Sequence, residues 1–479
     1  MTIKFEVPLD HNDPEPRDLK RTIEVSADLV YASSKDLTPT RDASSCEVEF
    51  QRWFPEEPKQ PILVYLCGGP GDGNKPARIP FLNEYALNHG FGILYPNYRG
   101  CAGSGSEITA DSPKKHLTAD YLAHFRQDSI VADLEAIRMC LNGIKFILLG
   151  QSFGGWIATT YLSFCPKGLR GVYITAGLPP VGQDPKSVYE HLYHRLVNKN
   201  GEYYQKYPED GKKVMEIVKF LARLDGGKGL KLCGTGSQDE QPERLSARGF
   251  LTLGRRLGGD NGPQEVHDLV NKFFKDREDT GTISRATIES FIEAGGTTFK
   301  LPVRPLYGVL HEAIYISGPG IASKWAAQRV VQRKITKDDR RFEWLQDDCD
   351  WKFESVRPGK VMPPYFSGEM IFEFMLVDAG EKLAPFIRAA KTLAEKDDWP
   401  PLYDEKALGR NGVPVRAMIF RNDMYVDPEL SHKTACMIGN CHVVEPGKGM
   451  THGSIKYNTE EVLKRLLGKK FGRHAWEWT

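Results

Sequence analysis

The chain has 479 residues, which is enough to build one large core and a second lobe. It carries 64 Lys and Arg against 63 Asp and Glu, and this balance argues against nucleic acid or a membrane surface as its main partner. No run approaches 18 apolar residues, the N-terminus is too polar for a signal peptide, and the 9 cysteines are scattered without a C-x-x-C pair, so we expect a cytoplasmic protein with neither a disulfide framework nor a zinc site.

The first third of the chain is patterned as strands that alternate with helices. Residues 22–32 and 47–54 alternate apolar and polar side chains, which predicts antiparallel edge strands. Residues 120–141 place their apolar side chains on one face, which predicts an amphipathic helix. Short apolar runs predict buried strands at residues 61–66, 91–95, 146–149 and 171–176. This alternation predicts a mostly parallel sheet that is covered by helices on both faces.

From residue 181 the pattern becomes helical. One apolar stripe comprises Val214, Ile217, Leu221 and Leu224, and a second lies within residues 264–274. The Gly-, Lys- and Asp-rich residues 225–244 predict a mobile loop. Strand patterns return at residues 413–420 and 441–444, and residues 459–467 predict a closing helix. We therefore expect an α/β fold with a doubly wound sheet, built from residues 1–180 and 396–479, and a helical cap inserted as residues 181–395.

The stretch that organises the chemistry is Gly150-Gln-Ser-Phe-Gly154, a G-x-S-x-G pattern. It lies between a predicted strand and a predicted helix, which is the context in which this motif presents a nucleophilic serine on a strained turn. Side chains two positions either side of Ser152 must be nearly absent, and glycines meet that demand. A glycine-rich turn after a strand is also common without function, but the combined context favours Ser152 as a nucleophile.

A serine nucleophile needs a base and an acid that orients it, and in this arrangement they follow in the order acid, then histidine. Asp423 follows the predicted strand 413–420 in an Arg-Asn-Asp turn. Asp427 is the alternative, but it precedes Pro428 and is expected to cap the next helix. We favour Asp423, although Asn-Asp pairs are also ordinary turn residues.

His452 is the predicted base, because it follows the last strand and has Gly449 and Gly453 near it. His442 is the alternative, but it lies within the predicted strand 441–444, where we expect a core histidine. The oxyanion of the intermediate needs two backbone N–H donors. We expect them to be the amides of Phe153 and of Gly69 in the glycine-rich turn after the strand 61–66, although a plain tight turn would explain those glycines equally well.

Taken together, several segments resemble the prolyl aminopeptidases, also called proline iminopeptidases. They are residues 67–71 (CGGPG), 98–104 (YRGCAGS), 125–131 (FRQDSIV), 135–138 (EAIR) and 150–155 (GQSFGG). The cap adds residues 311–315 (HEAIY), 324–327 (KWAA) and 368–372 (GEMIF), which resemble the longer bacterial and fungal branch. The resemblance implies an α/β-hydrolase with a helical cap that removes N-terminal proline from short peptides.

The chain departs from the family at Cys67, where a histidine is usual, at Asn97-Tyr98, where Asp or Asn and Gln are usual, and at Phe420-Arg-Asn-Asp423, where the usual loop is Gly-Arg-Tyr-Asp. The backbone donors are unaffected by Cys67, but a supporting side chain is lost.

The resemblance implies cap glutamates that bind the substrate amine, because a buried cation needs an anionic partner. By motif position these are Glu369 and Glu312, with Glu373 as a weaker alternative.

The expected mechanism is acyl transfer through Ser152, His452 and Asp423, with Phe153 and Tyr315 as walls for the proline ring and with no metal or cofactor. Two alternatives stay open. A carboxylic-ester hydrolase would use the same triad without the cap glutamates, and a non-catalytic binding module would keep only the fold. An epoxide or haloalkane hydrolase is disfavoured, because those enzymes place Asp where this chain has Ser152. The oligomeric state and the residue preference are not indicated.

Overall fold

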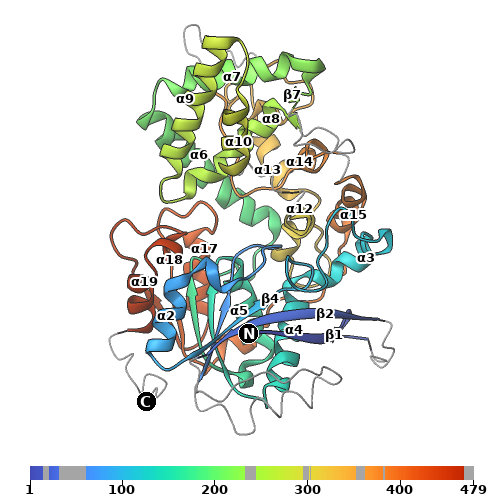
Figure 1. Cartoon of the computed structure of the whole chain (residues 1–479), viewed down its shortest axis with the longest axis vertical. Helices are drawn as coiled ribbons and strands as arrows, with labels where there is room; N and C mark the ends of the chain where they lie inside the picture. Colours follow the sequence, from blue (N-terminus) through green and yellow to red (C-terminus); the bar gives the residue numbers. More distant parts are fainter. Residues whose placement is uncertain are drawn as a thin grey trace.

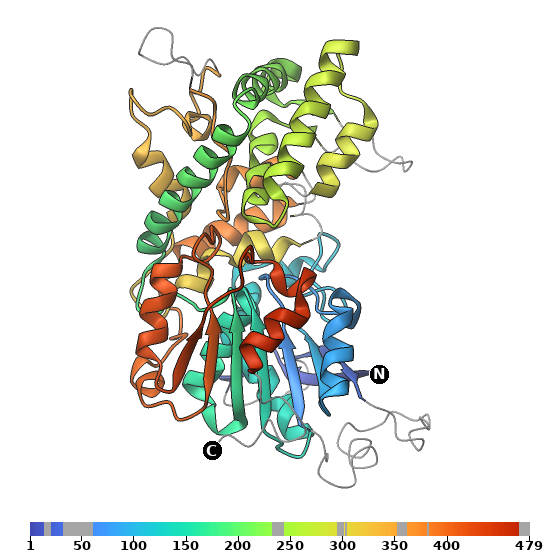
Figure 2. The ribbon, with the colours of Figure 1, turned by 90° about the vertical axis from the view of Figure 1, so that its left-hand side faces the viewer.

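The computed structural model describes residues 1–13, 21–31, 61–231, 244–294, 301, 304–351, 362–380 and 383–468. Its lower half is a sheet flanked by helices, and its upper half is a helical cap (Figures 1 and 2). The predicted strand 47–54 and residues 232–243 of the predicted mobile loop lie outside the described residues. Within the described ranges, no helix combines the length and the apolar character needed to cross a bilayer.

The core is an eight-stranded sheet in the order β1-β2-β4-β3-β5-β6-β9-β10. From β4 to β10 all neighbouring strands are parallel, whereas β1 and β2 join antiparallel at one edge. The strands are β1 Thr2–Pro8, β2 Thr22–Val30, β3 Ile62–Leu66, β4 Gly92–Asn97, β5 Phe146–Gln151, β6 Leu169–Thr175, β9 Val415–Met418 and β10 Cys441–Val444. The predicted parallel sheet is confirmed, and β1 is an additional strand that the sequence patterns did not indicate.

Helices cover both faces of this sheet. Helices α2 and α19 pack together on one face, and α4 and α5 pack together on the other (Figures 1 and 2). The core helices are η2 Pro76–Arg78, α2 Pro80–Asn88, η3 Lys114–His116, α3 Ala119–Leu122, η4 Ala123–Phe125, α4 Gln127–Cys140, α5 Phe153–Phe164, η5 Pro166–Gly168, α16 Glu405–Gly409, α17 Pro428–Met437, α18 Ser454–Tyr457 and α19 Thr459–Leu467. Strands β3, β4 and β5 are buried throughout, and burial on both faces of a parallel sheet explains why most of their residues are apolar.

The cap lies above the carboxyl ends of the parallel strands (Figure 2). Its elements are α6 Pro185–Lys206, α7 Asp210–Arg223, η6 Leu224–Gly227, β7 Leu230–Lys231, β8 Arg244–Leu245, α8 Ala247–Leu251, η7 Thr252–Gly258, α9 Gly262–Thr280, α10 Arg285–Ala294, α12 Pro305–Leu310, η8 Glu312–Tyr315, α13 Ala326–Lys334, η9 Glu343–Leu345, α14 Glu373–Asp378 and α15 Ala384–Glu395. The predicted stripe of α7 is buried at Val214, Ile217 and Leu221, so burial of one helix face holds the cap together.

The predicted helix over residues 120–141 was wrong near its start, because Arg126 has an extended backbone that separates η4 from α4. The reason is the side chain of Arg126, which is fully buried and leaves the helix to join the cap to the core. Its Nη1 donates to the carbonyl of Ile316 at 2.8 Å, and its Nη2 donates to the carbonyl of Pro400 at 2.8 Å. The guanidinium also lies 4.5 Å from the ring centre of Trp399.

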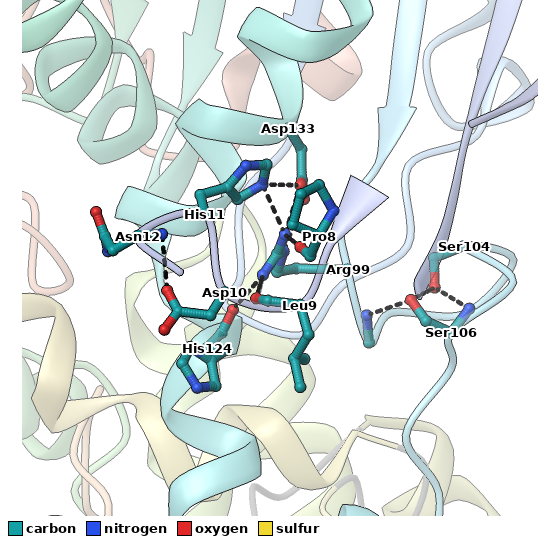
Figure 3. A network of polar contacts seen from close by, with 11 residues as sticks. Pro8, Leu9, Asp10, His11, Asn12, Arg99, Ser104, Ser106, His124 and Asp133 are labelled. Atoms are coloured by element: carbon teal, nitrogen blue, oxygen red, sulfur yellow. Dashed lines mark hydrogen bonds and ion pairs between the residues drawn. The ribbon is translucent and has the colours of Figure 1, made fainter. Parts of the chain in front are cut away.

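A second buried arginine, Arg99, fixes the N-terminal strands to the core (Figure 3). Its Nε donates to Asp133 Oδ2 at 2.7 Å, and Asp133 Oδ1 lies 2.7 Å from His11 Nε2. Arg99 Nη1 donates to the carbonyls of Leu9 and His124. Because the carboxylate and the carbonyls together satisfy a buried cation, this network holds the chain after β1 against α4.

Candidate active site

Ser152 occupies the sharp turn between β5 and α5, with φ 53° and ψ −125°. A positive φ is unfavourable for serine and persists only where the surroundings impose it. Here the Ser152 N–H donates to the carbonyl of Thr175 at 3.1 Å, and its carbonyl accepts from the N–H of Gly155 at 2.7 Å. The strained strand–turn–helix geometry is that of a nucleophile elbow.

The glycines around Ser152 are required by close backbone contacts. A Cβ on Gly150 would lie 2.6 Å from the carbonyl oxygen of Gly154, and a Cβ on Gly154 would lie 2.0 Å from that of Leu66. Both distances are too short for any side chain. The elbow therefore depends on the two glycines of the motif, as the spacing predicts.

Asp423 and His452 meet beyond the carboxyl ends of β9 and β10. His452 Nδ1 lies 2.7 Å from Asp423 Oδ2, and the Asp423 side chain is 2% exposed. The other oxygen, Oδ1, accepts from the N–H groups of Tyr425 at 2.8 Å and Val426 at 3.1 Å. Because the carboxylate engages Nδ1, Nε2 is the ring nitrogen that remains for proton transfer.

The two alternatives to this pair lie elsewhere. Asp427 caps α17, as expected, with its Oδ1 accepting from the N–H groups of Glu429 and Leu430, both at 3.0 Å. The expectation of a core histidine at His442 was wrong. His442 is exposed on β10, because β10 is the edge strand of the sheet and one of its sides has no neighbouring strand among the described residues.

The glycine-rich turn after β3 lies against the elbow. A Cβ on Gly68 would lie 3.1 Å from the Cβ of Ser152, and a Cβ on Gly69 would lie 3.7 Å from Phe153 Cδ1. These contacts place the turn beside Ser152. Cys67 is buried beneath it, and burial and the nearby Asp72 raise the pKa of its thiol to about 12, so this cysteine is a packing residue and not a nucleophile.

Glu369 lies in the cap among cationic and hydroxyl groups. Arg255 Nε lies 2.7 Å from Glu369 Oε2, and Oε1 accepts from the hydroxyl of Tyr307 and lies 3.6 Å from His311 Nε2. The side chain is 10% exposed. Burial alone would raise its pKa, but Arg255, together with His311 and Tyr307, outweighs burial and holds the pKa of Glu369 well below its ordinary value.

Glu312, the second nominated carboxylate, is the first residue of η8, and its side chain lies at the start of α13. Its oxygens accept from the N–H groups of Ala326 at 3.1 Å and Ala327 at 2.9 Å. The residue is 7% exposed, and burial raises the pKa of its carboxyl although the two amides lower it. Glu373, the weaker alternative to Glu369, is instead half-buried and pairs with Lys391 at 2.6 Å.

Comparison with known proteins agrees with this architecture. The family model of the alpha/beta hydrolase fold matches residues 61–224. Proline iminopeptidase from Aeromonas sobria is 33% identical over 414 residues, which are 85% of this chain and 87% of that protein. Proline iminopeptidase aneH from Aspergillus aculeatus is 30% identical over 481 residues, which are 98% of this chain and 93% of that protein. The chain belongs to the proline iminopeptidase family.

A third relative matches a shorter part of this chain. Proline iminopeptidase from Saccharolobus solfataricus is 29% identical over 245 residues, which are 49% of this chain and 68% of that protein. The sheet order and the matched segment together show that this member of the proline iminopeptidase family has the α/β-hydrolase fold.

Aromatic rings connect the two halves of this proline iminopeptidase family member near the elbow. The rings of Trp156 in α5 and Tyr315 in η8 have centres 6.3 Å apart, and Tyr189 lies 5.5 Å from Tyr315. The Tyr189 hydroxyl lies 3.1 Å from His311 Nδ1. Trp156, Tyr315 and Tyr425 line one pocket between core and cap. These rings therefore pack the junction between core and cap close to the elbow.

Several of these residues were not found from the sequence. Tyr307, Arg255 and Trp156 gave no pattern that distinguishes them from ordinary helix residues. Two others could have been found from the sequence. His311 begins the segment 311–315 that pointed to Glu312, and Tyr425 lies in the turn that pointed to Asp423.

Proposed function

We propose that this protein is a serine aminopeptidase that releases N-terminal proline from short peptides through Ser152, His452 and Asp423. The observation that carries the proposal is the 2.7 Å contact between His452 Nδ1 and Asp423 Oδ2, formed by loops that follow two parallel strands. Ser152 follows a third strand of the same parallel set. Since parallel strands end at one edge, this arrangement supports a common site for the three side chains.

The proposed reaction has two halves. His452 Nε2 takes the proton of Ser152 Oγ while Oγ bonds to the carbonyl carbon of the N-terminal residue. The amides of Gly69 and Phe153 stabilise the oxyanion, and His452 then gives the proton to the departing amine nitrogen as the C–N bond breaks. His452 Nε2 takes a proton from the water that attacks the acyl-enzyme and returns it to Ser152 Oγ as the C–O bond breaks and the free amino acid leaves. Asp423 keeps the imidazole in the required tautomer.

The amine of the substrate is proposed to bind among the cap carboxylates. Glu369 is anionic and mostly buried, and it supports a site for a cation that is shielded from water. Glu312 is the second proposed carboxylate, since it is buried in the cap and its oxygens are held in place by the amides of Ala326 and Ala327. The relatives named proline iminopeptidase support proline as the released residue. Phe153 and Tyr315 are the proposed walls for its ring.

The experiment that tests this function compares a proline arylamide with a neutral ester in Glu369→Gln and Glu312→Gln variants. We expect arylamide cleavage by Glu369→Gln to fall about 10- to 100-fold in kcat/KM, with ester cleavage much less affected. Glu373→Gln is the control, because Glu373 pairs with Lys391 outside the proposed pocket. No loss on the arylamide would favour a carboxylic-ester hydrolase, and equal losses on both substrates would show that the glutamate does not bind the substrate amine.

We further propose a cytoplasmic enzyme that acts on short peptides with a free N-terminus. The near-equal numbers of basic and acidic residues support a small substrate over nucleic acid or a membrane. Localisation of a fluorescently tagged full-length chain tests the compartment, and a secreted product would overturn this part of the proposal.

A further inference from the structure

One short cap segment touches the loops of both Asp423 and His452. We define the bracing segment as residues 255–260, at the end of η7 and before α9. The backbone carbonyl of Arg255 accepts from the Tyr425 hydroxyl at 2.6 Å. The carboxylate of Asp260 accepts from the hydroxyl of Thr451. The cap is therefore bonded to the loop after β9 and to the loop after β10 through neighbouring residues of a single segment.

Close packing reinforces the first of these bonds. A Cβ on Gly258 would lie 2.4 Å from Met424 Cγ and 2.6 Å from Tyr425 Cε2, so the bracing segment lies directly on the Asp423 loop. No side chain could occupy that space without moving the side chains of Met424 and Tyr425. The contact therefore depends on a glycine at this position of the cap.

The residues that the segment holds are neighbours of the proposed catalytic pair. The Tyr425 N–H donates to Asp423 Oδ1 at 2.8 Å, and the Tyr425 ring lies 4.6 Å from the His452 ring, centre to centre. Thr451 directly precedes His452, in a loop that contains Gly447, Gly449 and Gly453. Glycines give a loop many conformations, so an imidazole on such a loop needs external contacts to hold one position.

Arg255 also connects the segment to the proposed amine site, since its side chain pairs with Glu369. We propose that the bracing segment positions the Asp423–His452 pair, and that Tyr425 and Thr451 are positioning residues that transmit this constraint from the cap. The inference rests on the proposed function and deepens it: the cap not only covers the site but completes its geometry. A small displacement of a general base is enough to slow acyl transfer strongly.

Three variants test this inference. Tyr425→Phe keeps the ring beside His452 and removes the bond to Arg255, whereas Thr451→Val keeps the branched shape and removes the bond to Asp260. The third variant combines both changes. Tyr204→Phe is the matched control, because its hydroxyl donates to the carbonyl of Pro364 at 2.6 Å within the cap. Each protein is assayed on a proline arylamide and by its rate of fluorophosphonate labelling at Ser152.

We expect kcat of each single variant to fall about 5- to 20-fold with KM within about twofold of wild type, and the double variant to fall further. Labelling should slow by similar factors, while Tyr204→Phe keeps the wild-type rates. Wild-type kcat and labelling in the double variant, or equal losses in Tyr204→Phe, would overturn the inference. If wild type is labelled at Ser152 but releases no proline, the peptidase assignment fails, and the labelling rates of the variants still decide the role of the segment.

Discussion

Arg255 and Glu369 form a mostly buried ion pair, with Nε and Oε2 2.7 Å apart, in the pocket proposed for the amine of the substrate. A cation therefore already neutralises the carboxylate in the structure. A substrate ammonium must displace this guanidinium from Glu369 or share the carboxylate with it. Because the Arg255 side chain is 29% exposed, we expect the substrate ammonium to displace it toward solvent.

The first prediction concerns this competition. Arg255→Met removes the internal cation, so we expect KM for a proline arylamide to fall about 3- to 10-fold, because a carboxylate without a partner gains more from binding the substrate ammonium. Steady-state kinetics of wild type and Arg255→Met provide the measurement. A higher KM in the variant would show instead that Arg255 orients Glu369 for the substrate.

The second prediction concerns acid stability. The pKa of Glu369 is depressed in the folded protein, so its charge contributes stability that is complete above the ordinary carboxyl pKa of about 4.3 and is lost as the pH falls through the folded-state pKa. We expect Glu369→Gln to unfold with about 2–4 kcal/mol less free energy at pH 7. Urea unfolding should show that this difference is unchanged at about pH 5.5 and shrinks below about pH 4. If the difference in free energy of unfolding between wild type and Glu369→Gln grew in acid, the ion pair would not be what stabilises the protein.

The third prediction concerns the carboxylate behind the imidazole. In Asp423→Asn the side-chain amide can donate to His452 Nδ1. This favours the tautomer that carries its proton on Nε2, and Nε2 then cannot accept the proton of Ser152. We expect kcat to fall about 10³- to 10⁴-fold with little change in KM. Asp427→Asn is the matched comparison and should keep most activity, because Asp427 caps α17. A stronger loss in Asp427→Asn than in Asp423→Asn would contradict the assignment of Asp423 as the acid.

The fourth prediction compares two glycine-to-alanine changes. Gly154→Ala would place a Cβ 2.0 Å from the Leu66 carbonyl oxygen, so we expect it to destabilise the fold by about 3 kcal/mol or more. Gly201 lies in α6, and a Cβ added there would meet no atom within 4 Å, so Gly201→Ala should stabilise by about 0.5–1 kcal/mol. Urea unfolding of both variants checks the pair. Similar free energies of unfolding for Gly154→Ala and Gly201→Ala would contradict the close packing around Gly154.

Local patterns accounted for much of the fold and for the candidate nucleophile. The strand before Ser152 and the helix after it are consecutive in the chain. The glycines at positions 150 and 154 follow from the lack of space for side chains next to this sharp turn. The capping role of Asp427 was also predicted, because a cap bonds to amides two and three residues ahead. The pairing of Asp423 with His452 followed from their positions after two strands that proved to be neighbours.

Contacts made across the chain could not be predicted in this way. Arg255 of η7 meets Tyr307 of α12 around Glu369, and these residues are far apart in the chain, so their packing leaves no local signal. The break at Arg126 has the same origin, because its partners are the distant carbonyls of Ile316 and Pro400. His442 was misjudged because its exposure depends on β10 being the edge of the sheet, which is a property of the whole sheet order.

The central claim is that Ser152 is the nucleophile of an aminopeptidase. It is tested most directly by the initial rate of proline 4-nitroanilide cleavage by wild type and by Ser152→Ala, purified in parallel and compared at equal concentration. The account predicts turnover by wild type and a rate at least about 10³-fold lower in Ser152→Ala. A rate for Ser152→Ala within about tenfold of wild type would contradict it.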